Sequence, residues 1–266
     1  MRIASWNVNS LPVRMPRVLE FLALHRPDVL CLQETKVRPE AFPHLELQVA
    51  GYSAIDHSGG GRAGVALLVA DDHAVSDVHL GLPDQPDVLE ARWVEAVVEG
   101  VRVASVYVPN GRSVDHPAFA MKLAFLDCMV RHVAGWGEGE AVVAGDFNVA
   151  PGDLDVYDPV RYIGSTHTTP RERDALQRMQ AAGLRDAFRV LHPDEHGFTW
   201  WDYRAGNFHK NLGMRIDLFM ASDPLLATPG DGADHAVGPS YVLARDFRKG
   251  HKPSDHAPIV LTVTKT

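Results

Sequence analysis

Six polar segments at the ends of apolar runs constrain the fold of this chain more than any other feature of its sequence. The stretch VVAGDFNVAP, residues 142–151, shows the pattern, because small apolar residues lead directly into Asp146 and Asn148. A buried strand that ends in a carboxylate and a carboxamide implies a polar partner beyond its end, since buried polar groups need partners. The other five segments are Trp6-Asn7-Val8-Asn9, Gln33-Glu34-Thr35, Tyr107-Val108-Pro109-Asn110, Arg215-Ile216-Asp217 and Ser254-Asp255-His256.

The apolar runs predict strands that alternate with amphipathic helices. Short β-branched runs predict strands at Arg2–Val8, Asp28–Gln33, Tyr52–Asp56, Gly64–Val69, Leu89–Val98, Val101–Val108, Ala141–Gly145, Phe198–Tyr203, Arg215–Ala221 and Ile259–Val263. A one-sided spacing of apolar residues predicts helices at Arg14–His25, Pro117–Val133 and Pro170–Ala182. This order predicts one α/β domain over residues 1–266, with mixed rather than strictly parallel sheets.

The bulk properties fit a cytoplasmic globular domain. A chain of 266 residues that is 45% hydrophobic buries a sizeable core without disulfides. Cys31 and Cys128 lie in apolar stretches and are expected to be reduced thiols. We expect neither a secretory signal in MRIASWNV nor a membrane span. The net charge of −8 argues only weakly against a nucleic-acid partner, because bound cations and local basic patches offset it.

The six polar segments supply a particular set of functional groups. Hard oxygen ligands come from Asn7, Glu34, Asp146, Asn148 and Asp255. Such a set suits Mg²⁺, with Mn²⁺ as a substitute, and does not suit zinc. Asp217 and His256 form a second candidate pair, in which the carboxylate favours the charged imidazole.

A water nucleophile fits this set better than a covalent one. The sequence places no Ser or Cys in a nucleophile-elbow context. A hard cation, an activated water and a cationic imidazole together suit hydrolysis of a phosphate ester. Any one of these residues alone is more often a turn or cap residue. That all six segments have only a structural role is a much weaker interpretation than a shared functional site.

Seven segments of the sequence resemble the exonuclease III family of DNA-repair enzymes. They are WNVNS (6–10), LQETK (32–36), YVPNG (107–111), GDFNVAP (145–151), TWWDYR (199–204), MRIDLF (214–219) and KPSDHAPI (252–259). The resemblance covers essentially the whole chain and implies a four-layer α/β sandwich of two facing mixed sheets flanked by helices. It also implies a Mg²⁺-dependent abasic-site endonuclease and 3′-exonuclease that acts on duplex DNA as a monomer.

The resemblance assigns roles to the polar segments. Glu34 would hold the metal, with Asn7 and Asp255 close to it. Asp146 would orient or deprotonate the attacking water, and Asn148 would bind the scissile phosphate. Asp146, Asn148 and His256 also count as candidate metal ligands.

The remaining catalytic residues would act on the phosphate itself. Tyr107 would contact or protonate an oxygen of the phosphate or leaving group, with Asn110 beside it. His256, supported by Asp217, would stabilise the transition state. Asn9 is a further candidate for substrate binding.

A substrate pocket is expected beside these residues. Trp200, near Met214, falls at the family's pocket tryptophan and would accept a sugar that lacks a base. We expect one of Trp200 and Trp201 to be buried and the other free. The basic segment 245–252 and the loop 204–210 are interpreted as contacts to the DNA backbone, with a solvated charge run as the equally weighted alternative.

Two positions depart from the family pattern. Leu212 stands where some relatives place a basic residue that enters the duplex. His167 precedes the predicted helix at Pro170, where relatives with a small residue are good abasic-site endonucleases. Some relatives with His favour trimming of the 3′ terminus, because the ring obstructs a continuous strand.

Three other functions compete with the leading interpretation. One is a specialised 3′-phosphatase or 3′-exonuclease with little internal incision. Another is a metal-dependent phosphatase of small or lipid phosphates, against which Trp200 and KPSDHAPI argue. The last is a catalytically silent DNA-binding protein, which the complete set of acids disfavours.

Overall fold

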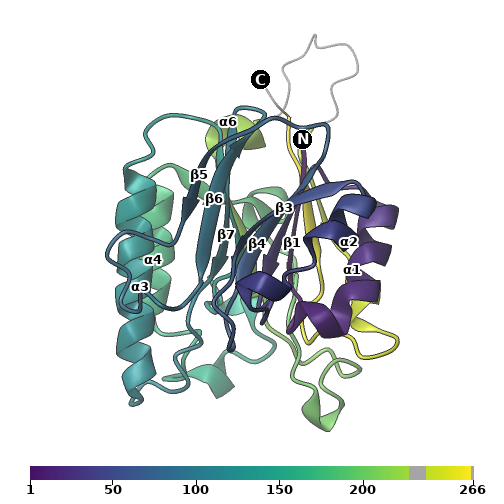
Figure 1. The fold of residues 1–266 in the computed structure, drawn as a ribbon. Coiled ribbons are helices and arrows are strands. Elements are labelled where there is room, and N and C mark those ends of the chain that lie inside the picture. Colours follow the sequence, from purple (N-terminus) through teal and green to yellow (C-terminus); the bar gives the residue numbers. More distant parts are fainter. Residues whose placement is uncertain (228–237, 265–266) are drawn as a thin grey trace.

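A computed structural model of the chain describes residues 1–227 and 238–264. These residues form two six-stranded mixed sheets that pack face to face, as the resemblance implied. The first sheet has the order β11-β12-β1-β2-β4-β3 and the second has the order β5-β6-β7-β8-β10-β9. Helices cover both outer faces, so the described fold has four layers (Figure 1).

The strands and helices have the following bounds. The first sheet comprises β1 Arg2–Asn7, β2 Val29–Gln33, β3 Tyr52–His57, β4 Val65–Ala70, β11 Ser240–Leu243 and β12 Ile259–Thr262. The second comprises β5 Val75–Leu80, β6 Trp93–Val98, β7 Val101–Tyr107, β8 Ala141–Asp146, β9 Leu184–Asp186 and β10 Asp217–Ser222. The α-helices are α1 Leu11–His25, α2 His44–Val49, α3 Pro117–Ala134, α4 Pro170–Ala181, α5 Ala187–Leu191 and α6 Asp223–Leu226.

Three apolar clusters fill the spaces between the four layers. One lies between the two sheets and includes Val29, Val103 and Phe219. The others lie between each sheet and its outer helices, with α1 on the first sheet and α3 and α4 on the second (Figure 1). Successive residues of a strand point to opposite faces of its sheet, so each central strand contributes side chains to two clusters. This explains why these strands appear in the sequence as continuous apolar runs.

The topology gathers the predicted polar segments at one end of the sandwich. Each sheet contains one parallel pair, β1 with β2 and β7 with β8, so these four strands end at the same edge. The antiparallel strands β10 and β12 begin at that edge, because Asp217 pairs with Asp146 and Ile259 pairs with Ser5. The carboxyl ends of four strands and the starts of two therefore converge, which is where an α/β sheet presents ligand-binding groups.

Several local predictions differ from the structure. The segment predicted as a strand at Phe198–Tyr203 makes only isolated bridges, because Trp200 pairs with both Met214 and His256 instead of joining a sheet. The predicted strand Leu89–Val98 begins only at Trp93, after a turn in which the Glu90 amide bonds the Asp87 carbonyl. The first helix begins at Leu11, three residues before the predicted Arg14.

The sequence analysis also missed some short elements. It did not identify the edge strands β5, β9 and β11 or the helices α2, α5 and α6. Cys31 and Cys128 are buried free thiols, in agreement with the prediction. None of the described helices is both long enough and apolar enough to span a bilayer.

Candidate active site

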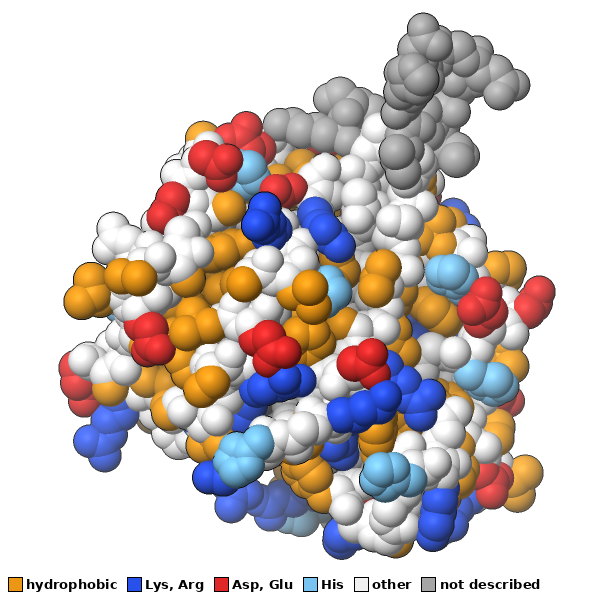
Figure 2. Space-filling view, turned by 90° about the vertical axis from the view of Figure 1, so that its right-hand side faces the viewer, with side chains coloured by type: hydrophobic (Ala, Val, Ile, Leu, Met, Phe, Trp, Pro, Cys, Tyr) orange, Lys and Arg blue, Asp and Glu red, His pale blue; other side chains and the backbone are white. Residues whose placement is uncertain are grey.

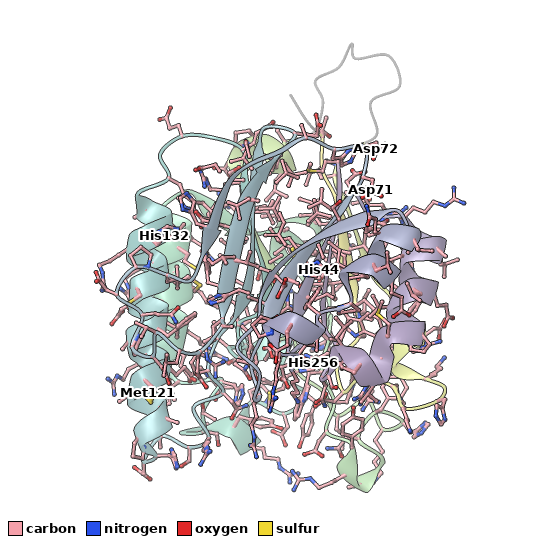
Figure 3. All side chains as sticks on the ribbon, in the orientation of Figure 1. His44, Asp71, Asp72, Met121, His132 and His256 are labelled. Atoms are coloured by element: carbon pink, nitrogen blue, oxygen red, sulfur yellow. The ribbon has the colours of Figure 1, made fainter. Side chains whose placement is uncertain are left out.

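Two carboxylates and an imidazole form the centre of the gathered polar segments. Ligand atoms of Glu34, Asp146 and His256 lie within 4.8 Å of one another. The Asn7 side-chain amide joins the two acids, since its Nδ2 donates to Glu34 Oε1 at 2.8 Å and to Asp146 Oδ2 at 2.9 Å. His256, labelled in Figure 3, lies between the lower ends of the two sheets in that view.

A buried ion pair fixes the orientation and charge of His256. Its Nδ1 lies 2.8 Å from Asp217 Oδ2, and its Nε2 faces Asp146 Oδ2 at 3.8 Å. Burial opposes a charge on the imidazole, but the carboxylates of Asp217 and Asp146 outweigh burial and raise the pKa of His256 to about 10. The imidazole is therefore a cation at neutral pH and has both ring nitrogens protonated.

Asp146 is the most perturbed acid of the site. Burial, together with the charges of Asp217 and Glu34, outweighs the attraction of His256 and raises the pKa of Asp146 to about 7. Its Oδ1 accepts a 2.9 Å hydrogen bond from the Asn148 amide N–H, which fixes the carboxylate plane. A buried carboxylate with a pKa near neutrality has the properties of a general base.

Tyr107 stands at the end of β7, beside these acids. Burial and the charges of Glu34 and Asp146 raise the pKa of Tyr107 well above its ordinary value. The Arg92 guanidinium lies 4.7 Å from the centroid of the Tyr107 ring. The phenol therefore stays protonated at neutral pH and can donate a hydrogen bond into the pocket.

A cluster of two amides and one imidazole borders the acids. Asn110 Nδ2 donates to Asn148 Oδ1 at 3.1 Å, and His167 Nε2 lies 3.0 Å from the same oxygen. Asn148 Nδ2 donates to the Val108 carbonyl. Burial and the nearby Lys122 ammonium lower the pKa of His167, so its ring is neutral.

An apolar wall adjoins this polar cluster. The cavity has a volume of about 330 Å³ and includes the side chains of Tyr162, Trp200, Met214 and Ile216 along its lining. Trp200 is partly exposed while Trp201 is buried, in agreement with the expected division between the two indoles. One half of the cavity therefore suits an anion, and the other half suits an uncharged, flat or sugar-like group.

Asp255 and Asn9 lie at the rim. Asp255 Oδ1 accepts from Asn9 Nδ2 at 2.9 Å, and its Oδ2 accepts from Trp200 Nε1 at 3.0 Å. Asn9 Oδ1 in turn accepts from Lys36. Asp255 lines the cavity but does not belong to the cluster of Glu34, Asp146 and His256. Its two oxygens thus contact the Trp200 indole and the Asn9 amide.

The donor set fits a hard divalent cation. Glu34 and Asp146 bring two carboxylates together through Asn7, an arrangement whose mutual repulsion contributes to the raised pKa of Asp146. A cation beside them would relieve that repulsion, and oxygen donors are the ligands that Mg²⁺ and Mn²⁺ prefer. His256 also belongs to this group, and to act as a ligand its Nε2 would have to release a proton while Nδ1 stays bonded to Asp217.

Basic side chains lie in the segment 245–252, next to Asp255 of the site. Lys and Arg gather on the lower part of the face in Figure 2, which views the molecule from the α1 side. Within the basic segment 245–252, Arg245, Lys249 and Lys252 are exposed. Arg248 differs, because it is buried and donates to the carbonyls of Trp201 and Asp255. That arginine is a structural residue and not a free surface charge.

Leu212, which stands where some relatives have a basic residue, lies in the loop after Trp201. It is partly buried, and its backbone amide bonds the Asn207 carbonyl in the loop that follows Trp201. Its backbone therefore helps to close that loop.

Sequence reasoning missed residues that support the site from behind. Lys122 and Glu172 are fully buried and form an ion pair under the Asn148 and His167 backbones. Thr169 and Glu172 form a capping box at the start of α4, and the Thr-x-x-Glu spacing in the sequence could have revealed it. Nothing local reveals Lys122, which occupies an apolar position of the amphipathic helix α3.

A second buried ion network supports the start of β10. Arg215 donates to both carboxylate oxygens of Asp186, at 2.9 and 2.6 Å, and to Asp155 at 2.7 Å. Arg189 also reaches Asp155. This network fixes the chain immediately before Asp217.

Comparisons with known proteins agree with this geometry. The profile of the "Endonuclease/Exonuclease/phosphatase family" matches residues 4–256. The exodeoxyribonuclease III of Haemophilus influenzae is 33% identical over 273 residues, covering 97% of this chain and 98% of the relative.

Two solved structures have the same fold over the whole chain. One is the 3′ phosphatase NExo (D146N) from Neisseria bound to a product DNA hairpin, with a TM-score of 0.92, 36% identity and full coverage of both chains. The other is an AP endonuclease from Archaeoglobus fulgidus, with a TM-score of 0.90, 32% identity and coverage of 99% of both chains.

Proposed function

Because the chain belongs to the endonuclease/exonuclease/phosphatase family and is a nuclease of the exonuclease III type, we propose that it is a Mg²⁺-dependent DNA phosphodiesterase of base excision repair. It would incise DNA 5′ to abasic sites, remove groups that block 3′ ends, or do both. The substrates would be duplexes with abasic sites, nicks or blocked 3′ ends, and the enzyme would act as a cytoplasmic monomer.

One observation carries this proposal. The acid and imidazole cluster of Asp146 and His256 opens directly onto an apolar wall that includes Trp200 and Met214. A phosphodiester can therefore meet the polar half of the cavity while a baseless sugar meets the apolar half. A phosphatase of small, highly charged phosphates has no use for the second half.

Glu34 and Asp146 are the residues proposed to hold the metal, with Asn7 supporting both. A bound Mg²⁺ would offset negative charge on the phosphate oxygens and favour ionisation of water. Asn148 and Asp255 would lie at the edge of this site as further oxygen donors.

Asp146 and His256 are proposed to handle the proton and the charge of the reaction. Asp146, with one oxygen fixed by the Asn148 amide, accepts a proton from the attacking water. His256, charged and oriented by Asp217, donates a hydrogen bond to a phosphate oxygen as charge builds up on it.

Tyr107 and Asn148 are proposed to bind the phosphate and leaving group. Asn148 uses one amide hydrogen on the Val108 carbonyl and keeps the other for a phosphate oxygen. The Tyr107 hydroxyl, which stays protonated, donates to the phosphate or to the departing oxygen. Asn110 supports Asn148 from the side.

A paired assay tests this function. One duplex carries an internal abasic-site analogue and a second carries a nick with a 3′-phosphate, and both are incubated with Mg²⁺ or with EDTA. We expect Mg²⁺-dependent cleavage of at least one duplex. Hydrolysis of inositol phosphates with no reaction on either duplex would contradict the proposal and favour the small-phosphate alternative.

A specialised 3′-end enzyme is a second candidate, and His167 favours it. Its imidazole lies against Asn110 and Asn148 and lines the cavity, so it occupies space beside the proposed phosphate position. A continuous strand must pass this ring, whereas a chain that ends at a nick need not. Reaction only at the 3′-phosphate in the paired assay would select this candidate.

A further inference from the structure

The buried ion pair between Lys122 and Glu172 lies outside the cavity, yet it contacts all three segments that carry the phosphate-facing cluster. Resting on the proposed function, we propose that this pair is a positioning device that holds Asn110, Asn148 and His167 in one arrangement. Its role is to fix where these side chains point, and it does not touch the substrate.

Lys122 reaches the pair from the inner face of α3. Its side chain has 0% exposure, and its ammonium donates to the Asn148 carbonyl at 2.6 Å and to Glu172. Longer contacts of 3.4 Å join the same nitrogen to the Asn110 carbonyl and to Thr166 Oγ1. One ammonium thus connects the backbones of two residues whose side chains line the cavity.

Glu172 completes the device from the first turn of α4. Its Oε1 accepts from the His167 backbone amide and from Thr166 Oγ1, both at 2.9 Å. Its Oε2 accepts from the Thr169 amide at 3.0 Å and from the Thr169 hydroxyl at 2.7 Å. Both oxygens of this carboxylate are therefore fully used, and the third segment is tied to the other two.

The backbones that the pair holds are in unusual conformations. Asn148 has a φ of 50°, His167 a φ of 81° and Gly111 a φ of 83°. A Cβ at Gly111 would lie 3.0 Å from the Lys122 side chain and 2.9 Å from Thr166 Oγ1. Positive φ is uncommon for residues other than glycine, although Asn and His adopt it more readily than most, and a buried network helps to hold Asn148 and His167 there.

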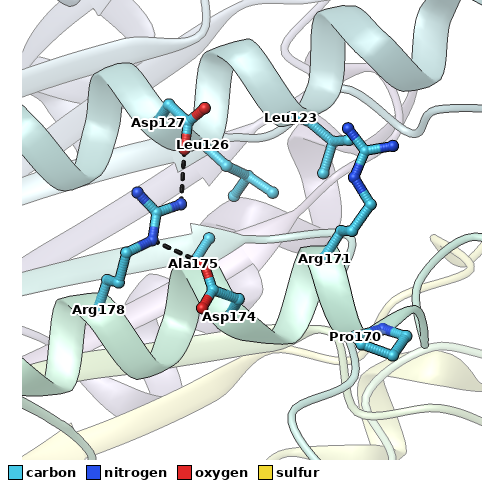
Figure 4. Close-up of a pocket in the computed structure, with 8 residues that line it drawn as sticks. All are labelled: Leu123, Leu126, Asp127, Pro170, Arg171, Asp174, Ala175 and Arg178. Atoms are coloured by element: carbon cyan, nitrogen blue, oxygen red, sulfur yellow. Dashed lines mark hydrogen bonds and ion pairs between the residues drawn. The ribbon is translucent and has the colours of Figure 1, made fainter.

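The same two helices are already joined elsewhere by an exposed ion pair. Figure 4 shows Arg178 of α4 bonded to Asp127 of α3, with Leu126 and Ala175 beside them. Burying the Lys122–Glu172 pair has a desolvation cost that apolar side chains would avoid, so joining α3 to α4 does not by itself require it. Its contacts to the cavity segments distinguish it from the exposed pair.

Three variants separate positioning from stability. Lys122→Met leaves the Glu172 carboxylate buried without its partner, so we expect a lower Tm and a lower kcat. The double variant Lys122→Met with Glu172→Gln removes both charges and is expected to recover most of the Tm. We expect its kcat on the reactive duplex to stay about 10- to 100-fold below wild type, because displaced catalytic groups cost rates of this size. The matched control, Arg178→Met, removes the exposed pair and should leave kcat unchanged.

A kcat that returns to within twofold of wild type in the double variant would overturn the proposal and leave the pair a purely structural one. All rates are measured well below the Tm of each variant, so that the folded fraction does not enter.

A second readout does not depend on activity. In the wild-type protein the side-chain amide signals of Asn110 and Asn148 should be sharp and dispersed in ¹⁵N spectra, since both amides are hydrogen-bonded. In the folded double variant these signals should shift and broaden, while Arg178→Met should leave them in place. Unchanged signals would contradict positioning. A wild-type protein inactive on both duplexes would contradict the proposed function while this readout still tests the ion pair.

Discussion

At the scale of single residues, the site combines groups whose charges are set by their neighbours. Asp146 is an acid with a raised pKa, and His256 is a base with a raised pKa. Burial and the charges of Asp217 and Glu34 raise the pKa of Asp146, whereas the carboxylates of Asp217 and Asp146 raise the pKa of His256 against the effect of burial. Function and stability therefore oppose each other at Asp146.

Replacing Asp146 by Asn tests this opposition. We expect the rate to fall on the order of 10²–10⁴-fold, the range for a positioned general base, while DNA binding persists. In EDTA the wild-type stability should decline as pH rises from 3.8, the ordinary pKa, to about 7, because the folded state keeps a proton that the unfolded state has lost. Asn does not titrate, so the variant should lack this decline.

Thermal melts at pH 5 and pH 7.5 measure the effect. The variant should have a higher Tm than wild type at pH 7.5 and a smaller advantage at pH 5. Near-normal turnover would remove Asp146 from the mechanism. If the variant and the wild type showed the same dependence of Tm on pH, ionisation of Asp146 would not reduce the stability of the folded state.

Replacing His167 by Gly tests the control of substrate choice. His167 has a φ of 81°, which Gly adopts without strain, so the variant should fold at least as well as wild type. Loss of the ring opens the space beside Asn148, and we expect the ratio of abasic-site incision to 3′-phosphate removal to rise. An unchanged ratio, measured on the two duplexes of the paired assay, would separate His167 from specificity.

At the scale of elements, a buried ion network centred on Arg215 lies at the start of β10. Arg215 is fully buried and neutralises Asp155 and Asp186, which come from a 3₁₀ turn and from β9. Without it, two carboxylates lose their main partner immediately beside Asp217. Arg215 thus anchors the chain two residues before Asp217, which lies opposite Asp146, without a part in the proposed chemistry.

We expect Arg215→Met to lower the free energy of unfolding by about 3–5 kcal/mol, since it leaves buried acids without their partner. Arg185→Met is the control, because Arg185 is exposed and lies 3.7 Å from exposed Asp223. The control should change the free energy by less than about 1 kcal/mol. Urea denaturation of both variants measures the difference, and equal losses would contradict a special role for Arg215.

At the scale of the whole molecule, a net charge of −8 coexists with a basic rim beside Asp255, formed by the exposed Arg245, Lys249 and Lys252. Exposed Lys249 and Lys252 lie in one loop of that rim. Asp246, in the same loop, pairs with Lys249 at 2.6 Å, and other acids lie inside the site. Local charge, and not the sum, decides whether DNA can approach this end.

Salt dependence of binding tests the rim. Each lysine that neutralises a DNA phosphate contributes about one unit to the slope of log K against log salt. We expect the Lys249→Ala and Lys252→Ala double variant to lose up to about two units of slope. Arg185→Ala, located on β9 beside the far end of β10, should leave the slope unchanged. A slope unaffected by the lysine changes would make the segment a solvated charge run.

Much of the site followed from the sequence, because its signal is local. A polar residue at the end of an apolar run is visible in a few residues, and Glu34, Asp146, Asn148 and His256 were found that way, whereas the role of Tyr107 came from the family resemblance. The paired sheets also followed, since strand and helix periods are properties of short segments and the family motifs span the chain. Edge strands such as β5 escaped prediction because an exposed strand carries no apolar alternation.

Tertiary structure alone decided what depends on distant partners. The charge of His256 comes from Asp217, 39 residues away in the chain, and from Asp146 across the strand end. Lys122 reads as one polar residue in an apolar helix face until folding brings Glu172, Asn110 and Asn148 around it. The sequence determines which groups are present, but their protonation and direction depend on burial and on neighbours that only the folded chain brings together.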